Sequence, residues 1–335
     1  MRVLLDGTPL LGPRTGVGRY TARLLAELAV REDLDAAVLG LTARGRTELR
    51  RLCPVPVRGC GVPARALRRA WAHGSFPPVE LLAGAADVVH GTNGVLPPSR
   101  RAAGVLTVHD LAFWHTPELV GPAERDLRVL VPAALARGAV VCTPTAAVAA
   151  QVQRAFGVPA TRCVVTPLGV DAEWFDVPAA PPTRLRLPAR YVVFVGADGP
   201  RKGLDLLRAA ADAPGAPPLV VVGPGARGTG YLPEPELRAV VAGARALVLP
   251  SVDEGFGLPA LEAQAAGVPV LCSDLPALRE STGGFATFLP RQVAAWAAAL
   301  AELPAADPRA REHARTATWA RTAETTVAAY RLAKA

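Results

Sequence analysis

Two carboxylates in the second half of the chain bracket a glycine-rich segment, which reads Glu254-Gly-Phe-Gly-Leu-Pro-Ala-Leu-Glu262. The apolar run before this segment, residues 246–249, predicts a buried strand. Pro259 predicts the start of a helix, because the N–H that proline lacks would be unpaired in the first helical turn anyway. The segment therefore predicts a strand–loop–helix unit that can bind a charged or hydroxyl-rich ligand.

The loop of this unit has the composition of an anion site. Gly255 and Gly257 let the backbone turn tightly and approach a ligand. The amides around Phe256, Gly257 and Leu258 would then face the space before the helix, where the helix dipole favours a negative group. A diphosphate has a suitable charge and shape for such a site.

The two glutamates suit hydroxyl groups beside that anion. Glu254 begins the loop and is placed to accept hydrogen bonds from sugar hydroxyls. Glu262 is expected in the first turn of the helix, where ribose hydroxyls are its natural partners. The spacing alone leaves a second interpretation open, in which Glu262 only complements the helix dipole, an effect worth about 0.3–1 kcal/mol.

A second expected strand, residues 191–195, leads into a cationic segment, Gly196-Ala-Asp-Gly-Pro-Arg-Lys-Gly203. Lys202 is one of only two lysines in the chain, which otherwise uses arginine. Arginine offers phosphate a planar fork and lysine offers a point charge. Cations at a helix start are unfavourable without an anion, so Arg201 and Lys202 predict a phosphate nearby.

The first half of the chain carries polar residues where strands are expected to end. Residues 12–20 join the first strand to its helix and include Gly16 and Gly18. His109 follows the apolar run 105–108, and Asn93 follows the run 88–90. A lone histidine is usually structural, but its place at a strand's carboxyl end favours a functional role for His109.

Short apolar runs alternate with helical patterns along the chain, which predicts an α/β fold with parallel sheets. The expected strands are residues 3–5, 37–41, 88–90, 105–108, 140–143, 163–166, 191–195, 219–222, 246–249 and 268–272. The expected helices are residues 17–30, 122–137, 146–156, 203–212 and 259–266. A segment with four prolines, residues 176–188, interrupts the alternation and predicts a linker between two doubly wound domains. The ligand site is then expected in the cleft between the two domains.

Composition limits the classes of partner. Hydrophobic residues make up 50% of the 335 residues, enough for two cores, and the net charge is +8. The arginines are scattered and not interleaved with aromatics, which disfavours nucleic-acid binding. The densest basic cluster, Arg65, Arg68 and Arg69, suits an anionic membrane or phosphorylated acceptor, or else a solvated helix face. No apolar run reaches the roughly 18 residues of a membrane span, and the early Asp6 argues against a signal peptide, so a cytoplasmic protein is expected.

The residues that bind metals are not arranged in familiar patterns. The five cysteines form no C-x-x-C pair, which disfavours a structural zinc or a disulfide framework. The only D-x-D motif, Asp33-Leu34-Asp35, follows an expected helix and is expected at the surface. No metal or other cofactor is therefore expected.

Residues 251–280, SVDEGFGLPALEAQAAGVPVLCSDLPALRE, resemble the donor-binding segment of retaining glycosyltransferases of family four, in their mannosyltransferase-like group. These enzymes have the GT-B architecture, two Rossmann-like domains facing a cleft. The family's mark is two glutamates separated by seven residues, and Glu254 and Glu262 match it. The resemblance implies that Glu254 binds the transferred sugar near its reacting face and that Glu262 binds the nucleotide ribose.

Other segments are similar to the same family. Residues 195–204 resemble its phosphate-clamping strand end, so Gly196, Arg201 and Lys202 would hold the donor diphosphate. Residues 12–20 resemble its mobile glycine loop, with Gly16 toward the donor phosphate and Gly18 toward the acceptor. His109 would face the donor sugar or the acceptor. The remaining matches are Asn93 in an acceptor-side loop, and Trp319 and Tyr330 in a closing helix.

The resemblance implies an acceptor-side domain over residues 1–176, a linker over 177–189, a donor-binding domain over 190–307 and, over 308–335, a C-terminal helix that packs back on the first domain. The implied reaction moves a hexose from a nucleoside-diphosphate sugar to an acceptor hydroxyl, with retention of anomeric configuration and without metal. Lipid-linked sugars, polysaccharides and small natural products are all open as acceptors, and contact with the inner membrane surface is an option.

Two alternatives stay open. One is a GT-B phosphorylase or sugar-nucleotide epimerase, and the other is a non-catalytic subunit that only binds nucleotide sugar. The chain also departs from the family in residues 222–231, where the usual helix-bearing connection is expected to be much shorter, and after Glu280. That connection helps to shape the base pocket, so the base is not assigned.

Overall fold

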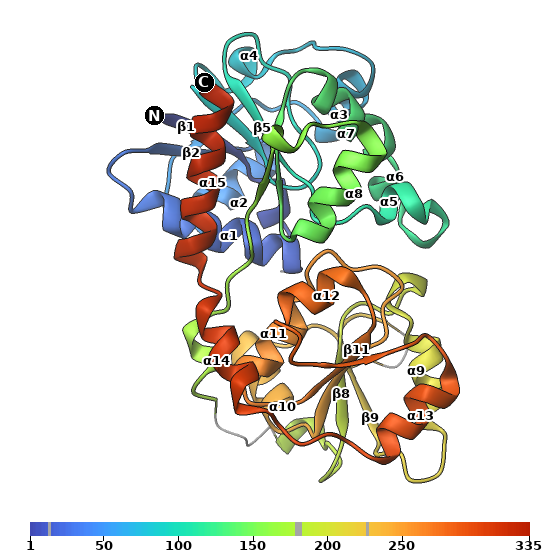
Figure 1. The fold of residues 1–335 in the computed structure, drawn as a ribbon. Coiled ribbons are helices and arrows are strands. Elements are labelled where there is room, and N and C mark those ends of the chain that lie inside the picture. The colour runs from blue at the N-terminus through green and yellow to red at the C-terminus, as the bar shows by residue number, and fades with distance from the viewer. Residues whose placement is uncertain (13–14, 178–182, 226–227) are drawn as a thin grey trace. The chain divides into compact units, whose positions relative to one another are not determined.

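The computed structural model describes residues 1–335 apart from 13–14, 178–182 and 226–227. The chain forms two compact units, one of Met1–Gly169 with Trp319–Ala335 and one of Val170–Thr318 (Figure 1). Each unit has a parallel sheet covered by helices, which confirms the predicted α/β fold. The expected linker falls partly on residues 178–182, outside the described part of the chain.

The first unit holds a 7-stranded sheet in the order β3-β2-β1-β4-β5-β6-β7. Its strands are β1 (Arg2–Asp6), β2 (Asp35–Leu39), β3 (Val57–Arg58), β4 (Val88–Gly91), β5 (Ala103–Thr107), β6 (Val140–Thr143) and β7 (Cys163–Val165). The central strands are apolar on both faces because helices cover both sides: Leu4, Leu106 and Val141 are at most 2% exposed.

The helices of this unit include the predicted ones, one of them divided, together with helices that were not predicted. They are α1 (Gly16–Ala29), α2 (Ala43–Leu52), α3 (Ala64–His73), α4 (Val79–Ala83), α5 (Ala112–His115), α6 (Pro122–Arg125), α7 (Leu127–Ala136), α8 (Ala146–Phe156) and α15 (Trp319–Lys334). The single helix predicted over 122–137 is two helices, divided at Asp126, whose N–H donates to Glu124 O and Pro122 O to close α6.

The second unit holds a 5-stranded sheet in the order β12-β11-β10-β8-β9. Its strands are β8 (Val192–Val195), β9 (Leu219–Val222), β10 (Ala246–Leu249), β11 (Val270–Ser273) and β12 (Thr287–Leu289). Its helices are α9 (Leu204–Ala211), α10 (Glu234–Ala242), α11 (Leu258–Ala265), α12 (Pro276–Ser281), α13 (Val293–Ala301) and α14 (Pro308–Thr316). Trp296 and Leu300 of α13 pack with Leu207 of α9 in the core.

A helix that was not predicted lies between β9 and β10, after the connection over residues 222–231. Helix α10 buries Leu237, Val240 and Val241. Two prolines at its start, Pro233 and Pro235, obscure the helical pattern in the sequence, although proline is tolerated in a first turn. The glycine-rich stretch before it includes residues 226–227, which lie outside the described part of the chain.

The C-terminal segment forms two helices where one was expected. Helix α14 belongs to the second unit and α15 to the first. The break falls at Ala317, whose backbone is extended and whose carbonyl accepts the Val170 N–H at 3.0 Å. Helix α15 contacts α1 and strands β4 to β7, and buries Trp319 and Tyr330.

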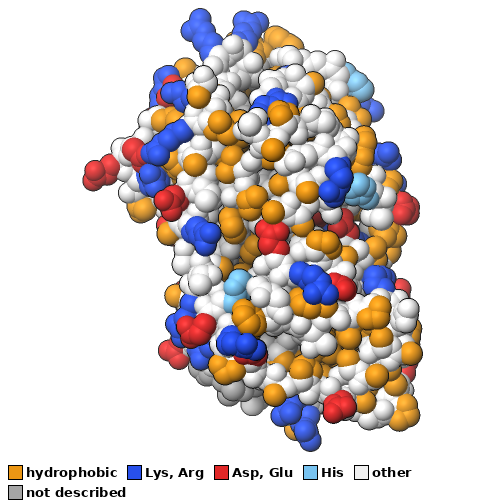
Figure 2. Space-filling view, viewed as in Figure 1, with side chains coloured by type: hydrophobic (Ala, Val, Ile, Leu, Met, Phe, Trp, Pro, Cys, Tyr) orange, Lys and Arg blue, Asp and Glu red, His pale blue; other side chains and the backbone are white. Residues whose placement is uncertain are grey.

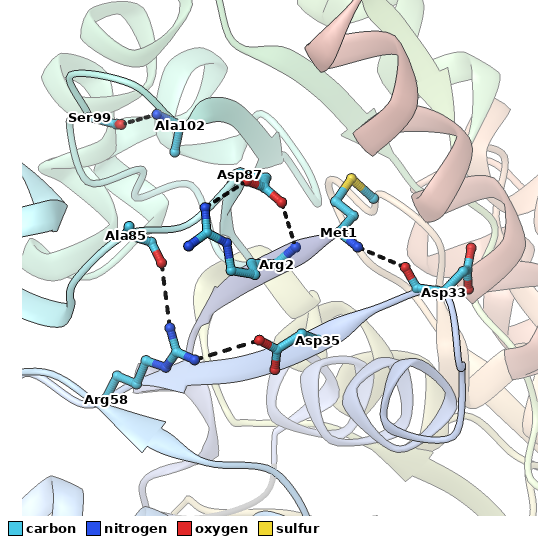
Figure 3. A network of polar contacts seen from close by, with 9 residues as sticks. All are labelled: Met1, Arg2, Asp33, Asp35, Arg58, Ala85, Asp87, Ser99 and Ala102. Carbon is cyan, nitrogen blue, oxygen red and sulfur yellow. Dashed lines mark hydrogen bonds and ion pairs between the residues drawn. The ribbon is translucent and has the colours of Figure 1, made fainter.

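Ion pairs gather near the amino ends of the strands in the first unit (Figure 3). The Arg2 guanidinium lies 3.1 Å from the Asp87 carboxylate, and the Met1 ammonium donates to Asp33 O at 2.9 Å. Asp35 pairs with Arg58 at 3.7 Å. The D-x-D motif is therefore at the surface, as predicted, with its aspartate side chains 44% and 56% exposed.

Candidate active site

Glu254 is the centre of the polar site in the second unit. Its Oε1 accepts hydrogen bonds from Lys202 Nζ at 2.6 Å and from Ser251 Oγ at 2.8 Å. The carboxylate is buried, with 9% of its side chain exposed, whereas the Lys202 side chain is 24% exposed. Both contacts converge on Oε1. Ser251 is a site residue that sequence reasoning did not select, although it stands three positions before Glu254.

Two loops are tied together to form this contact. Lys202 ends a short 3-10 turn, Pro200–Lys202, and the Arg201 carbonyl accepts the Val252 N–H at 2.8 Å. The Arg201 guanidinium lies 3.4 Å from Asp253 O. Gly203 then turns the chain into α9 with a φ of +68°, and a Cβ there would lie 2.2 Å from Pro250 O. Only glycine fits, so the two loops can approach closely.

The glycine-rich loop after Glu254 leads directly into α11. Gly257 precedes the helix with a φ of +75°, and a Cβ there would lie 2.3 Å from a Leu278 methyl group. Gly255, Phe256 and Leu258 are buried. No side chain caps the helix, so its first turn presents backbone N–H groups of the kind that bind anions.

Glu262 does not lie where the sequence placed it. The helix begins at Leu258, with Pro259 second, so Glu262 opens the second turn and the first turn has no acidic residue. A place in the second turn weakens the interpretation that Glu262 only complements the dipole, since that effect fades beyond the first turn. Its side chain is buried, with the residue 4% exposed.

The strand end that carries Gly196 is held by a second ion pair. Gly196 N–H donates to Val222 O at 2.9 Å, continuing the pairing of β8 with β9. Asp198 accepts from Arg208 at 2.9 Å and its N–H donates to Pro224 O. This loop is therefore braced before it reaches the two cations.

A third cation, Arg291, was missed in the sequence. Its guanidinium donates to Pro250 O at 2.6 Å, and a Cβ on Gly203 would lie 3.0 Å from it. Partial burial lowers the pKa of Arg291 from its usual value. The residue follows β12 in a segment with no recognisable motif, so only the fold brings it to Pro250.

In the first unit, His109 is held in one orientation. Its Nε2 lies 2.9 Å from Thr92 O, and a carbonyl can only accept, so Nε2 carries the hydrogen. In the neutral ring Nδ1 is then the acceptor. Burial lowers the pKa of His109, and its contacts with Thr92 and Asp110 partly oppose this. The Tyr20 ring packs edge-to-face against the His109 ring, with centroids 4.8 Å apart and planes at 82°, and this contact fixes the plane of the His109 ring.

The same contact ties His109 to the loop that carries Asn93. Thr92 is fully buried and its hydroxyl donates to Asp6 O at 2.9 Å, and Gly94 N–H donates to Thr107 O at 3.0 Å. Asn93, between them, is exposed. The predicted histidine and asparagine thus lie on two loops, after β5 and β4, which the contact between His109 and Thr92 joins.

A buried polar chain that sequence reasoning did not find lies behind His109. His90 contacts Tyr330 OH through Nδ1 and Thr107 Oγ1 through Nε2, both at 2.7 Å. Thr107 Oγ1 is also 2.9 Å from Tyr20 OH. Burial lowers the pKa of His90 to about 3, so this ring is neutral at working pH.

The glycine loop before α1 is described from residue 15 onward and at residue 12. Thr15 caps α1 by accepting from Gly18 N–H at 3.3 Å. A Cβ on Gly18 would lie 2.8 Å from Pro9 O, whereas one on Gly16 would meet nothing within 4 Å. Gly18 is therefore needed for packing, and Gly16 leaves open space.

Among the residues that the structure describes, no group of three or more His, Cys, Asp and Glu side chains is placed to hold a metal ion. In the same parts of the chain, no helix is both long and apolar enough to cross a membrane.

The fold is shared with solved glycosyltransferase structures. Sucrose-phosphate synthase from Thermosynechococcus elongatus superposes with a TM-score of 0.70 at 19% identity, covering 98% of each chain. The Anabaena protein HepE, solved in complex with UDP and glucose, gives a TM-score of 0.60 at 18% identity, covering 99% of this chain and 95% of HepE. These similarities establish the GT-B fold.

Two family models cover most of the sequence. One described as "Glycosyl transferase 4-like domain" matches residues 15–169, and one described as "Glycosyl transferases group 1" matches residues 189–305. The chain is a GT-B glycosyltransferase. The O-antigen chain mannosyltransferase B of Escherichia coli is 28% identical to this glycosyltransferase, over 84% of this chain and 85% of that protein.

Proposed function

We propose that this glycosyltransferase transfers a hexose from a nucleoside-diphosphate sugar to an acceptor hydroxyl, with retention of anomeric configuration and without a metal ion. The single observation that carries the proposal is the contact of Lys202 and Ser251 with the buried Glu254 carboxylate. It sets a cation for phosphate beside a carboxylate for sugar hydroxyls.

The donor's diphosphate is bound by the second unit. Lys202 and Arg201 supply positive charge, and the uncapped start of α11 supplies N–H groups. Glu254 Oε2 accepts from the transferred hexose, and Glu262 accepts from the ribose. Charge that develops on the leaving diphosphate is met by these fixed groups, which is the largest demand of such a reaction.

The reaction forms one bond and breaks one. The acceptor oxygen bonds to the anomeric carbon, the bond from that carbon to the diphosphate oxygen breaks, and the nucleoside diphosphate leaves with the electron pair. The acceptor's hydroxyl proton leaves with the diphosphate. Arg201 and Lys202 can stabilise the product without a metal ion.

In the first unit, His109 and Asn93 form hydrogen bonds with hydroxyl groups of the sugar and the acceptor. The hydrogen on His109 Nε2 is committed to Thr92 O, so Nδ1 is the atom that accepts a hydroxyl hydrogen. Asn93 is exposed next to Thr92, in the loop after β4, and contacts the acceptor. Gly16, with open space around its α-carbon, lets the α1 loop approach the donor phosphate, and Gly18 holds that loop on the acceptor side.

The names of the relatives guide the choice of sugar. The Escherichia coli relative is named a mannosyltransferase of O-antigen chains, and 35% identity over 174 residues relates this chain to a D-inositol 3-phosphate glycosyltransferase of Mycolicibacterium gilvum. The second match spans 39% of that protein. A hexose, with mannose first, and a lipid-linked sugar, polysaccharide or small natural product as acceptor are the choices to test.

A thermal-shift screen against GDP-mannose, UDP-glucose and other nucleoside-diphosphate hexoses tests the donor, because a bound ligand raises the unfolding temperature. The donor that binds is then assayed for release of nucleoside diphosphate with mannosides and lipid-linked sugars as acceptors. Turnover should survive EDTA, and its loss would overturn the metal-free mechanism. Binding without turnover on any acceptor would instead favour the non-catalytic subunit, and release of sugar phosphate would favour a phosphorylase.

We also propose that the protein works in the cytoplasm, with peripheral contact at the inner membrane surface through α3. Arg65, Arg69 and His73 line an exposed hollow on this helix, while Arg68 donates to Ala123 O. Elsewhere the basic side chains are spread among other residue types, as Figure 2 shows for one face.

Flotation with vesicles tests this contact. Binding to phosphatidylglycerol vesicles and not to phosphatidylcholine vesicles is expected, and R65E/R69E should abolish it. The control R50E/R51E makes the same charge change on exposed positions of α2. Equal loss in both variants would mean that net charge alone, and not α3, drives the binding.

A further inference from the structure

The C-terminal helix α15 is linked to His109 by a chain of buried polar groups within the first unit. Tyr330 OH on α15 contacts His90 Nδ1 on β4, and His90 Nε2 contacts Thr107 Oγ1 on β5, each at 2.7 Å. Thr107 Oγ1 then contacts Tyr20 OH on α1 at 2.9 Å. Four elements, α15, β4, β5 and α1, therefore meet in one line of hydrogen bonds.

Every residue in this line of hydrogen bonds is buried. His90, Tyr20 and Tyr330 are 0% exposed, and Thr107 is 1% exposed. A neutral imidazole has one donor and one acceptor nitrogen, so one hydroxyl neighbour of His90 must donate and the other must accept. The hydrogens on either side of His90 are thus ordered in one direction, and removal of the Tyr330 or Thr107 hydroxyl takes the partner from a buried nitrogen of His90.

The chain ends on the ring that faces His109. The Tyr20 ring meets the His109 ring at 4.8 Å with planes 82° apart. Tyr20 OH is anchored on Thr107, and His109 Nε2 is anchored on Thr92 O, so both rings are held at two points. The direction of His109 Nδ1 depends on both anchors.

We propose that His90 is a positioning residue, which together with Thr107 and Tyr20 sets the ring plane of His109, and that Tyr330 makes this setting depend on α15. The proposal rests on the function assigned above to His109. The C-terminal helix then does more than complete the core, because it controls the aim of His109 Nδ1.

The test removes single hydroxyl groups from this line of hydrogen bonds while keeping the shape of each side chain. Tyr330→Phe and Thr107→Val are made in the full-length protein, and turnover is measured with the donor found by the screen above. We expect kcat to fall roughly tenfold to hundredfold with little change in KM for the donor, because a small misplacement of a reacting group has costs of this order. Tyr20→Phe should give the same pattern.

A second measurement does not depend on sugar transfer. Imidazole nitrogen resonances are recorded with ¹⁵N-labelled histidine; the chain has 5 histidines, and single His→Gln variants assign them. In the wild type, His109 should show the tautomer with hydrogen on Nε2. Tyr330→Phe and Thr107→Val should shift or broaden the His109 resonances, although neither residue is bonded to His109.

Two control variants each lose a buried hydroxyl group that does not belong to the hydrogen-bonded line from Tyr330 to Tyr20. Thr326 lies on α15 and its hydroxyl donates to Thr322 O at 2.7 Å, and Tyr191 OH donates to Val240 O at 2.7 Å in the second unit. Thr326→Val and Tyr191→Phe should lower the unfolding temperature as much as the test variants do. They should leave kcat and the His109 resonances at wild-type values.

The outcomes separate this inference from the proposed function. If His109 resonances in Tyr330→Phe and Thr107→Val match those of the controls, the positioning role is wrong, whatever the activity. If those resonances change but no donor is turned over by the wild type, the coupling stands and the proposed function fails. If kcat in Tyr330→Phe and Thr107→Val falls only as much as in Thr326→Val, the hydrogen bonds from Tyr330 to Tyr20 contribute to stability alone.

Discussion

The two polar centres of this glycosyltransferase differ in charge and in their contact with water. The centre of the second unit is ionic, with the Lys202 side chain 24% exposed beside the Glu254 carboxylate. The centre of the first unit consists of neutral imidazole and hydroxyl groups, and His90, Tyr20 and Tyr330 have no exposed surface. A partly wet ion pair can exchange its partners for a charged ligand, whereas a dry neutral network resists any change of partner.

This difference suggests a division of labour between the units. The ionic centre is suited to bind and release a diphosphate, because solvent screens the charges when no ligand is present. The neutral centre is suited to hold His109 in one orientation throughout the reaction. Variants in the two centres should therefore affect different quantities.

The largest effect is expected for His109→Ala, which should lower kcat roughly hundredfold or more while donor affinity stays within a few-fold of the wild type. The reason is that, in the proposed function, cations of the second unit bind the donor's charged groups. Steady-state kinetics and calorimetry measure the two quantities. His115→Ala removes an exposed histidine of α5 as the control. A fall in affinity with unchanged kcat would give His109 a packing role.

Lys202→Ala should weaken donor binding by roughly tenfold to hundredfold, since a charge-assisted hydrogen bond contributes about 1.5–3 kcal/mol. The affinity of the donor is measured by calorimetry. Lys334→Ala removes the other lysine of the chain, which is exposed near the C-terminus, and should bind the donor like the wild type. Equal affinities for both variants would remove Lys202 from the donor site.

Two glycines with the same backbone conformation test the close approach of loops in the ionic centre. Gly203 has φ +68° and Gly157 has φ +65°, but only at Gly203 would a Cβ meet another atom, Pro250 O at 2.2 Å. Gly157→Ala should cost about 1 kcal/mol from the left-handed backbone alone. Gly203→Ala should cost about 1–3 kcal/mol more, from overpacking. Urea unfolding measures both, and equal costs would show that the loops can separate freely.

The burial of His90 is expected to make the free energy of unfolding depend on pH. Its folded pKa of about 3 lies below the ordinary value of 6.5, so between these values the unfolded chain binds a proton that the folded chain does not. The contribution of His90 is thus fully present above pH 6.5 and is lost as pH falls, by about 1.4 kcal/mol per pH unit.

The free energy of unfolding at pH 7 and pH 5 checks this slope. His90→Gln removes the titrating group while keeping a donor and an acceptor, so its stability should depend less steeply on pH than that of the wild type. Parallel slopes for the two proteins would show that His90 is protonated in the folded state, which contradicts a neutral chain.

Much of the fold was predictable from local pattern. The strands over 140–143, 219–222 and 246–249 and the helix over 146–156 match the structure at both ends, because buried parallel strands are short apolar runs and Thr145 caps the helix. Helix α10 was missed because its prolines and the glycine-rich approach hide a short apolar face. The break between α14 and α15 depends on a bond from Val170 to Ala317, which no local pattern contains.

The sequence by itself determined the ionic centre. Its glycines, glutamates and cations lie in two short segments, and Gly203 and Gly257 have the left-handed backbone that favours glycine. Only the tertiary structure decided the position of Glu262 in the second turn, the approach of Arg291 to Pro250 and the chain from Tyr330 to Tyr20. His90 and Tyr330 are 240 positions apart and bear no motif, because the hydrogen bond between them is specified by burial in a common core and not by spacing along the chain.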